Sequence, residues 1–239
     1  MYSKETIEKY IRNMKNKMNE YSAYFDRIPG MAYRDICISK GNRKIGRVHN
    51  ISTAPIITCG NCSHCSGLCY DVKANIQYKS VMDARARNTV IAREHMDAFF
   101  TGIRAYISRR KTNKYFRWHV GGEIPSIEYF HEMVETARMF PKWHFWTYTK
   151  MHSIVNAYVS MHGRASIPEN FVIMFSEWDG MPLCNPFGFP VFSCKLKAGN
   201  KNHSPEYFDT LWKCPGNCDI CKKAHRGCIA GESSYANEH

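Results

Sequence analysis

Four cysteines fall within a short stretch of this chain, at Cys59, Cys62, Cys65 and Cys69. Their spacing is C-x2-C-x2-C-x3-C, the run with which bacterial ferredoxins ligate 4Fe–4S clusters. Background cysteine usage would almost never place four thiols so close together, so the pattern is specific. It predicts a cluster-binding loop.

A second group of four cysteines lies near the C-terminus, at Cys214, Cys218, Cys221 and Cys228. Its spacing is C-x3-C-x2-C-x6-C, in sequence rich in Gly, Pro and Lys that could not form a hydrophobic core alone. Such a segment needs a metal, a cluster or docking onto the body of the protein for its order.

Thiolate ligands select iron–sulfur clusters or zinc among the common cofactors. Zinc knuckles usually pair across about 15–20 residues, whereas these two groups are far apart and each has four thiols. One or two 4Fe–4S clusters are therefore favoured, and zinc is the alternative. If three thiols suffice for the first cluster, one iron is left open and Cys62 is the ambiguous member. In a further arrangement, the two groups share one cluster.

The bulk composition describes a soluble globular protein. The chain has 239 residues, of which 44% are hydrophobic, and no apolar run approaches the roughly 20 residues that span a bilayer. The N-terminus has no signal-peptide core, so we expect a cytoplasmic location without a membrane partner. Eleven cysteines in a reducing compartment favour metal or redox chemistry over disulfides.

The net charge of +12 favours partners that carry phosphate. Nucleic acid is one expected partner, and an electron donor is another if a cluster is bound. The positive charge would also balance an anionic cluster. The sequence does not indicate an oligomeric state.

The hydrophobic pattern alternates between strands and helices after an N-terminal amphipathic helix over residues 4–21. Such alternation is typical of a parallel sheet with right-handed crossovers. We expect strands at 48–58, 115–123, 144–149, 171–176 and 189–193, with helices at 72–110, 127–140 and 153–162 between the first four.

The predicted fold is therefore α/β, either a partial (βα) barrel or an open parallel sheet. Three parts are expected: residues 1–46 as N-terminal helix and connector, 47–195 as the α/β core, and 196–239 as a Cys-rich segment packed on the core. Ligands of such folds collect at the carboxyl ends of the strands. The residues at those ends are the first cysteine loop, Gly121–Gly122–Glu123, Lys150, and Glu177 with Asp179.

Two polar residues interrupt the strand at 115–123. Period-two alternation predicts Arg117 and His119 on one face, and Phe116, Trp118 and Val120 on the other. We take Arg117 and His119 as candidate site residues, with a satisfied core histidine as the alternative for His119.

These residues resemble the radical SAM superfamily, in which a cysteine loop follows the first strand and a Gly-Gly-Glu segment follows the second. The resemblance implies a partial (βα)6 barrel whose 4Fe–4S cluster binds S-adenosylmethionine at an open iron. Gly121, Gly122 and Glu123 would hold the methionine moiety, and Arg117, His119 and Lys150 would line the substrate side. The first loop departs from the superfamily's usual C-x3-C-x2-C, which occurs here at Cys214, Cys218 and Cys221.

Residues 117–126 and 145–150, taken with both cysteine groups, resemble more closely a phage- and plasmid-encoded family, gene product eighty-eight. Three functions follow as alternatives. The first is an iron–sulfur enzyme that cleaves S-adenosylmethionine reductively. The second is a non-catalytic redox or structural cluster protein, and the third binds or processes nucleic acid around structural clusters.

Overall fold

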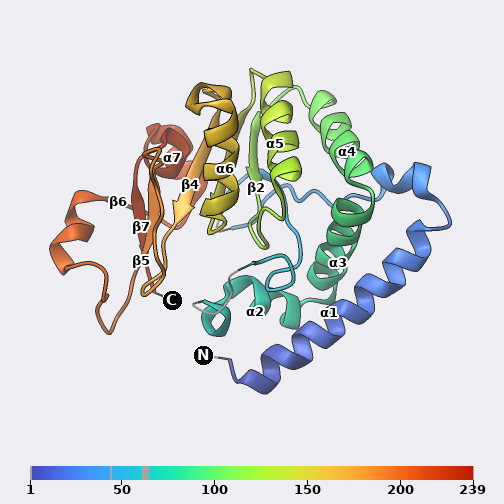
Figure 1. Ribbon diagram of the computed structural model, residues 1–239, viewed down its shortest axis with the longest axis horizontal. Helices are drawn as coiled ribbons and strands as arrows, with labels where there is room; N and C mark the ends of the chain where they lie inside the picture. Colours follow the sequence, from blue (N-terminus) through green and yellow to red (C-terminus); the bar gives the residue numbers. More distant parts are fainter. Residues whose placement is uncertain (1, 44, 61–64, 239) are drawn as a thin grey trace.

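A parallel sheet of seven strands organises the chain in the computed structural model, which describes residues 2–43, 45–60 and 65–238 (Figure 1). Within that part the strand order is β1-β2-β3-β4-β5-β7-β6, and every pairing is parallel. The predicted α/β class is confirmed, with the sheet open. The strands are β1 (His49–Ile51), β2 (Tyr115–Trp118), β3 (His144–Thr149), β4 (Phe171–Ser176), β5 (Val191–Lys195), β6 (Trp212–Lys213) and β7 (Ser234–Asn237).

Helices connect most of these strands. The α-helices are α1 (Lys4–Phe25), α2 (Tyr70–Gln77), α3 (Lys79–Glu94), α4 (Met96–Ser108), α5 (Ile127–Met139), α6 (His152–His162) and α7 (Cys218–Ala224). Short 3-10 turns are η1 (Pro29–Arg34), η2 (Ser66–Leu68), η3 (Arg164–Ser166), η4 (Pro205–Thr210) and η5 (Gly227–Ala230). None of the described helices is long and apolar enough to cross a membrane.

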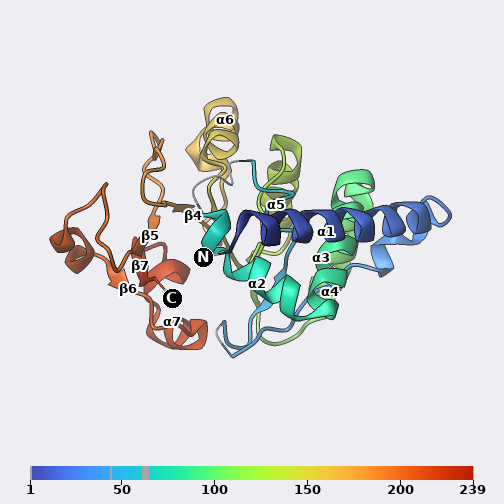
Figure 2. The same ribbon diagram turned by 90° about the horizontal axis from the view of Figure 1, so that it is seen from below.

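The strand order places α7 on the opposite side of the sheet from the other crossover helices. From β1 to β4 the strands are laid down in one direction, and right-handed crossovers then put α4, α5 and α6 on the same face. The step from β6 to β7 runs back toward β5, so the same handedness puts α7 on the other face. Figure 2 shows α6 and α7 on the two sides of the sheet. We call the face under α4, α5 and α6 the outer face, and the face under α7 the inner face.

Alternating side chains divide β2, β3 and β4 between these faces. The outer face carries an apolar core that includes the fully buried Phe116, Trp118 and Phe145. The inner face is more polar and aromatic, with Tyr115, Arg117, Trp146, Tyr148 and Val172 around α7. The outer face thus stabilises the fold, and the inner face carries the side chains that could bind a ligand or take part in a reaction.

Two predicted elements are divided differently in the structure. The first strand ends at Ile51 instead of reaching Thr58, because its partner β2 ends at Trp118, the residue opposite Ile51. Ile56 then adopts a left-handed backbone (φ 67°) before Thr58 is reached. The predicted helix over 72–110 is three helices, broken at Tyr78 and at His95. Neither breaking residue is Gly or Pro, so the sequence carried no break signal there.

The two ends of the chain attach differently to the sheet. The predicted amphipathic helix is confirmed as α1, which buries Tyr10, Met14 and Phe25 against the body. The C-terminal segment forms β6, α7 and β7, and β7 pairs with β5 over Phe192–Lys195. The Cys-rich tail therefore extends the sheet of the core.

Candidate functional site

The first cysteine group lies at the carboxyl edge of the sheet, in the segment between β1 and α2. Cys59, Cys65 and Cys69 are half-buried there, and Cys62 lies outside the described residues. The Ile56 N–H donates to Cys59 Sγ at 3.4 Å. Cys69 is the N-cap of α2. Burial raises the Cys69 pKa to about 11, opposed by the amides of the first turn of α2, which favour the thiolate.

A buried ion pair anchors this loop to the core. The Asp71 carboxylate, in the first turn of α2, accepts from Arg85 Nη2 at 3.1 Å and Nε at 3.2 Å, and Asn75 also donates to it. On the other side the Tyr10 hydroxyl donates to the Pro55 carbonyl at 3.1 Å. These contacts fix α2 and the start of the loop without any help from the thiols.

The Gly121–Gly122 pair is required by this packing. A Cβ on Gly121 would stand 1.7 Å from Asp71 Oδ2, and one on Gly122 would stand 2.0 Å from Thr53 Oγ1. Gly122 also has φ 82°, which favours glycine. The two glycines thus let the chain after β2 pass directly beside the loop that carries the first cysteine group.

Glu123 and Lys150 meet at the same edge. The buried Glu123 carboxylate accepts from Thr149 Oγ1 at 2.8 Å and from the Lys150 N–H at 2.9 Å. Burial by itself would lower the Lys150 pKa, but the thiols of Cys65, Cys59 and Cys69, together with Glu123, raise it above its ordinary value. Lys150 is therefore a cation facing the first cysteine group. The structure brings Gly121, Gly122, Glu123 and Lys150 together with these thiols.

The second cysteine group lies on the inner face and is assembled by the tail. Cys214 follows β6, Cys218 and Cys221 lie on α7, and Cys228 lies in η5. Cys214 acts electrostatically on the other three thiols, so the four are neighbours. Cys221 and Cys228 are buried, and burial raises the Cys228 pKa to about 11, opposed by the hydroxyls of Tyr148 and Ser234.

Arg117 lies on the inner face between the two groups. Its guanidinium stacks over the Tyr148 ring at 4.5 Å from the centroid. Burial would lower the Arg117 pKa, but Tyr148, Tyr70, Cys218 and Cys228 raise it. Because Tyr70 directly follows Cys69, the cation stands beside the second group and next to the chain that carries the first.

His119 does not share the face of Arg117, and the prediction that it would is wrong. Strand β2 ends at Trp118, and His119 takes φ 51°, which breaks the alternation. Its Nε2 is 3.0 Å from the Tyr129 hydroxyl on α5, in the outer core. Burial and then the charge of Arg85 lower the His119 pKa to about 3. His119 is therefore a neutral histidine that packs with Tyr129 in the outer core.

None of the thiols that the structure describes forms a disulfide. Within this part of the chain, the one group of three His, Cys, Asp or Glu whose ligand atoms lie within 4.8 Å of one another contains no cysteine. No three described thiols of either cysteine group have their sulfur atoms within 4.8 Å of one another.

The three remaining cysteines have separate environments. Cys194 lies on β5, where burial raises its pKa to about 11 and Lys150 acts in the opposite direction. Cys37 is held through its backbone, which bonds to the Asn88 side chain at 2.8 and 3.0 Å. Cys184 is exposed. Of these three, Cys194 is the one that lies near the candidate site.

The acidic residues after β4 form hydrogen bonds that stabilise the fold. Glu177 accepts from Ser193 Oγ at 2.9 Å and pairs with His203 Nε2 at 2.7 Å. Asp179 accepts the N–H groups of Lys201 and Asn202. These bonds hold the connection after β5 against the sheet. Sequence reasoning missed His203, whose partner lies 26 residues away and leaves no local pattern.

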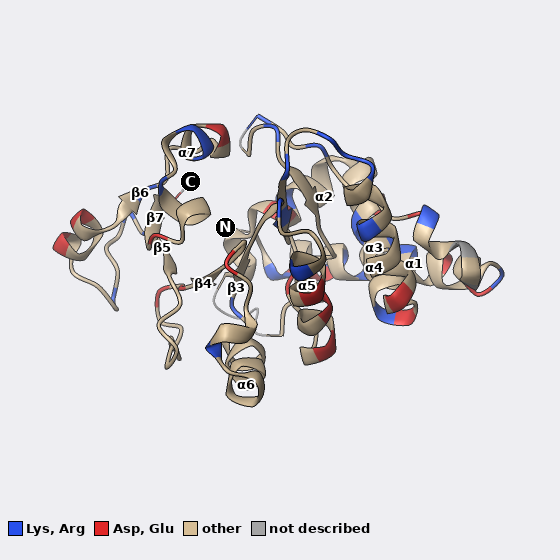
Figure 3. Cartoon of the chain, turned by 90° about the horizontal axis from the view of Figure 1, so that it is seen from above, with Lys and Arg blue, Asp and Glu red and all other residues tan. Residues whose placement is uncertain are grey.

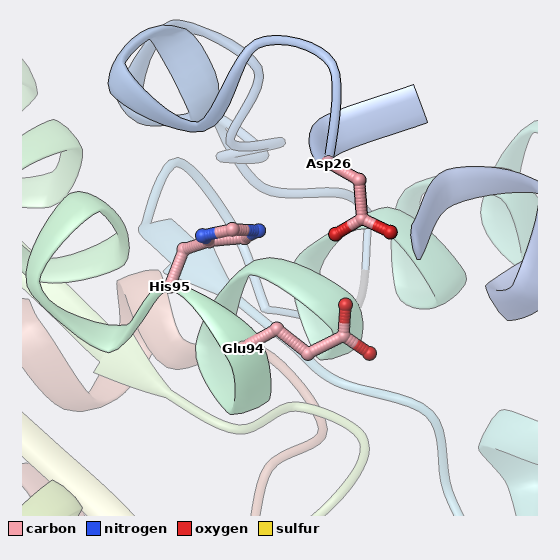
Figure 4. A group of neighbouring side chains, drawn as sticks. All are labelled: Asp26, Glu94 and His95. Atoms are coloured by element: carbon pink, nitrogen blue, oxygen red, sulfur yellow. The ribbon is translucent and has the colours of Figure 1, made fainter. Parts of the chain in front are cut away.

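The three residues whose ligand atoms do lie within 4.8 Å are Asp26, Glu94 and His95 (Figure 4). Asp26 caps α1, and Glu94 and His95 stand at the junction of α3 and α4. Both carboxylates are exposed, and Glu94 also accepts from Ser22 Oγ at 2.8 Å. The trio joins α1 to this junction at the surface, away from the cysteines.

Comparison with known proteins gives one match. A family model described as Gene product 88 matches residues 34–181, which is more than half of the chain. The match includes the first cysteine group and the segment from Arg117 to Lys150, and it ends before the second group. No curated protein and no solved structure matches the chain.

Proposed function

The chain belongs to the Gene product 88 family, and we propose that it is an iron–sulfur protein that carries two 4Fe–4S clusters and transfers electrons between them. Cys59, Cys65 and Cys69, with Cys62 as the fourth candidate ligand, would hold one cluster. Cys214, Cys218, Cys221 and Cys228 would hold the other. The cofactor supplies one-electron redox chemistry, and the protein positions it.

One observation carries this proposal. Two sets of thiols that lie far apart in the sequence meet the same sheet, one at its carboxyl edge and one on its inner face, and a cation accompanies each. Thiolates and the clusters they bind are anionic, so Lys150 and Arg117 compensate charge that would otherwise be costly to bury. A protein with merely buried thiols has no need of such cations.

The residues between the two groups suit electron transfer. Tyr70, Arg117 and Tyr148 form a continuous chain of interactions from Cys69 to Cys228. The positive charge of Arg117 lies on this route and stabilises the reduced state of a cluster on either side. The two clusters would then exchange electrons across the inner face, supplied by an external donor.

Anaerobic reconstitution tests the proposal directly. The full chain is loaded with iron and sulfide, and both elements are quantified alongside EPR spectra of the reduced protein. We expect the iron and sulfide of two clusters. The EPR lines should be broadened by coupling between the spins of the two reduced clusters. Iron for one cluster, or stoichiometric zinc in freshly purified protein with no gain of iron, would contradict it.

Reductive cleavage of S-adenosylmethionine is a second candidate, because Lys150 brings Glu123 and the first cysteine group into one site. In that function the first cluster would be held by Cys59, Cys65 and Cys69, which leaves an iron open at the carboxyl edge. The bonds from Thr149 and Lys150 to Glu123 would then hold that carboxylate toward the substrate. His119 has no part in this version.

Addition of S-adenosylmethionine separates the two candidates. An enzyme forms 5′-deoxyadenosine after reduction, and binding of the sulfonium compound changes the EPR spectrum of the first cluster. A pure electron carrier shows neither effect. The Cys62→Ser variant sharpens the comparison, because it retains the first cluster only when three thiols are enough.

A further inference from the structure

The amino edge of the sheet, opposite the first cysteine group, gathers basic side chains from three separate segments. They are residues 40–43 and 45–47 before β1, 109–114 between α4 and β2, and 222–226 at the end of α7, and none contains Asp or Glu. Figure 3, which looks onto this edge, shows Lys and Arg along α7 and on the loops beside it.

The charges that act on His49 show that the three segments converge. After burial, the influences that lower its pKa are the charges of Arg110, Lys40 and Lys222, one from each segment. The same convergence is visible in direct contacts. Lys222 Nζ donates to the Arg47 carbonyl at 3.0 Å and stands 5.1 Å from the Tyr115 ring centroid.

A hollow of about 490 Å³ opens where these segments meet. It is lined by Arg47, Thr112, Asn113, Asp219, Lys222 and Lys223. Its single acid, Asp219, is engaged internally, since it accepts the Arg47 N–H at 3.0 Å and pairs with Lys222. Arg47 and Lys223 are exposed and form no salt bridge among the described residues.

Helix termini account for part of this charge. Basic residues in the last turn of a helix offset its dipole and contribute about 0.3–1 kcal/mol, which explains Arg109 after α4 and Lys222 on α7. This account does not extend to the connector at 40–47, which follows no α-helix. It also leaves unexplained the exposed Lys111, which lies three residues beyond the end of α4.

We propose that this edge binds nucleic acid through its phosphodiester backbone. The hollow is concave and offers guanidinium, ammonium, amide and hydroxyl donors, the groups that contact phosphate oxygens. Binding to a lipid surface calls instead for an apolar face beside the basic one, and the hollow has no large apolar lining residue. The binding surface lies at the opposite edge of the sheet from the first cysteine group, and its two lysines on α7, Lys222 and Lys223, directly follow Cys221 of the second group.

The test measures binding of the full chain to one fluorescein-labelled oligonucleotide, supplied as single-stranded DNA, as duplex DNA and as RNA, over a series of NaCl concentrations. The test variant is Arg47→Ala, Lys111→Ala and Lys223→Ala combined. The matched control removes equal charge from the exposed face of α1, as Lys9→Ala, Arg12→Ala and Lys15→Ala. The single variant Lys111→Glu, on an exposed loop, covers the case in which the triple variant does not fold.

Wild type should bind with an affinity that falls steeply as salt rises. Removal of the three charges should weaken binding at least about tenfold near 0.1 M salt, and it should flatten the salt slope by about one for each phosphate that is no longer neutralised. The α1 control should bind like wild type. Equal binding by the two triple variants, absence of binding at low salt, or binding to phosphatidylserine vesicles without binding to any oligonucleotide would each overturn the proposal.

Discussion

The two cysteine groups depend on their surroundings in opposite ways. The first sits on a loop whose ends are fixed by a buried ion pair, a glycine pair and the packing of α1. The second sits on elements too short to be stable alone, a two-residue strand and a seven-residue helix. In the first region the fold prepares a place for a ligand. In the second, we expect the ligand to complete the fold.

The largest expected effect comes from the second group. The Cys221→Ser, Cys228→Ser double variant should lose about half of the iron and the order of the tail, because cluster binding supplies the folding free energy of such a segment. Limited trypsin digestion should then cut at the lysines and arginines of residues 213–226. Cys184→Ser, at an exposed thiol, is the control. If the tail of the double variant stays resistant to trypsin, the second group does not depend on its ligand for order, and the contrast between the two groups is wrong.

The first group should behave differently when it loses its ligand. Cys65→Ser should also remove about half of the iron, but the thermal unfolding midpoint and the trypsin pattern should stay close to those of wild type. The reason is that Asp71, Arg85 and Tyr10 already hold both ends of the loop. Tail digestion in this variant as rapid as in the tail double variant would show that both groups are structural.

Glycine substitutions probe the prepared site without touching a thiol. Gly121→Ala would drive a methyl group into Asp71, and overpacking of this kind costs about 1–3 kcal/mol. We expect the free energy of unfolding, measured by urea denaturation, to fall by this amount. The EPR signal should change for the first cluster alone. Gly30→Ala, where a Cβ meets nothing within 4 Å, should change the unfolding free energy by less than about 0.5 kcal/mol. Equal effects of the two substitutions would contradict the steric account.

The contrast between the regions also explains which features were visible in the sequence. Strands β3 and β4 were predicted at their observed ends because each is a short run of mainly apolar and aromatic residues, and α5 was correctly expected to begin at residue 127. The tail strands were missed, since β6 is two residues long and carries no periodic pattern. Its order is a property of pairing with β7, which no local stretch encodes.

The candidate site was predictable in composition and less so in geometry. Spacing alone identified both cysteine groups, and the strand ends correctly brought Glu123 and Lys150 to the first. Arg117 and His119 were assigned to one face because alternation was extended through a residue with φ 51°. Strand β2 ends just before this left-handed residue, so the alternation does not continue to His119.

The smallest predicted effect tests whether the support of the first group is sensitive to acid. His119 has a folded pKa of about 3 against about 6.5 when unfolded. Above pH 6.5 both states are neutral. As the pH falls below 6.5, the unfolded chain binds a proton that the folded chain does not bind, so the free energy of unfolding decreases.

Between about pH 8 and about pH 5.5 this decrease is about 1.4 kcal/mol for one such histidine. His119→Gln keeps a partner for the Tyr129 hydroxyl and removes the titration. Its unfolding free energy, measured in urea at both pH values, should therefore fall by about 1.4 kcal/mol less than that of wild type. Because Arg85 acts on His119 and also binds Asp71, acid should speed hydrogen exchange in α2 before it affects α7. Parallel pH dependence in the two proteins would show that His119 is protonated in the folded state, and would contradict a first region that is preformed around a neutral core.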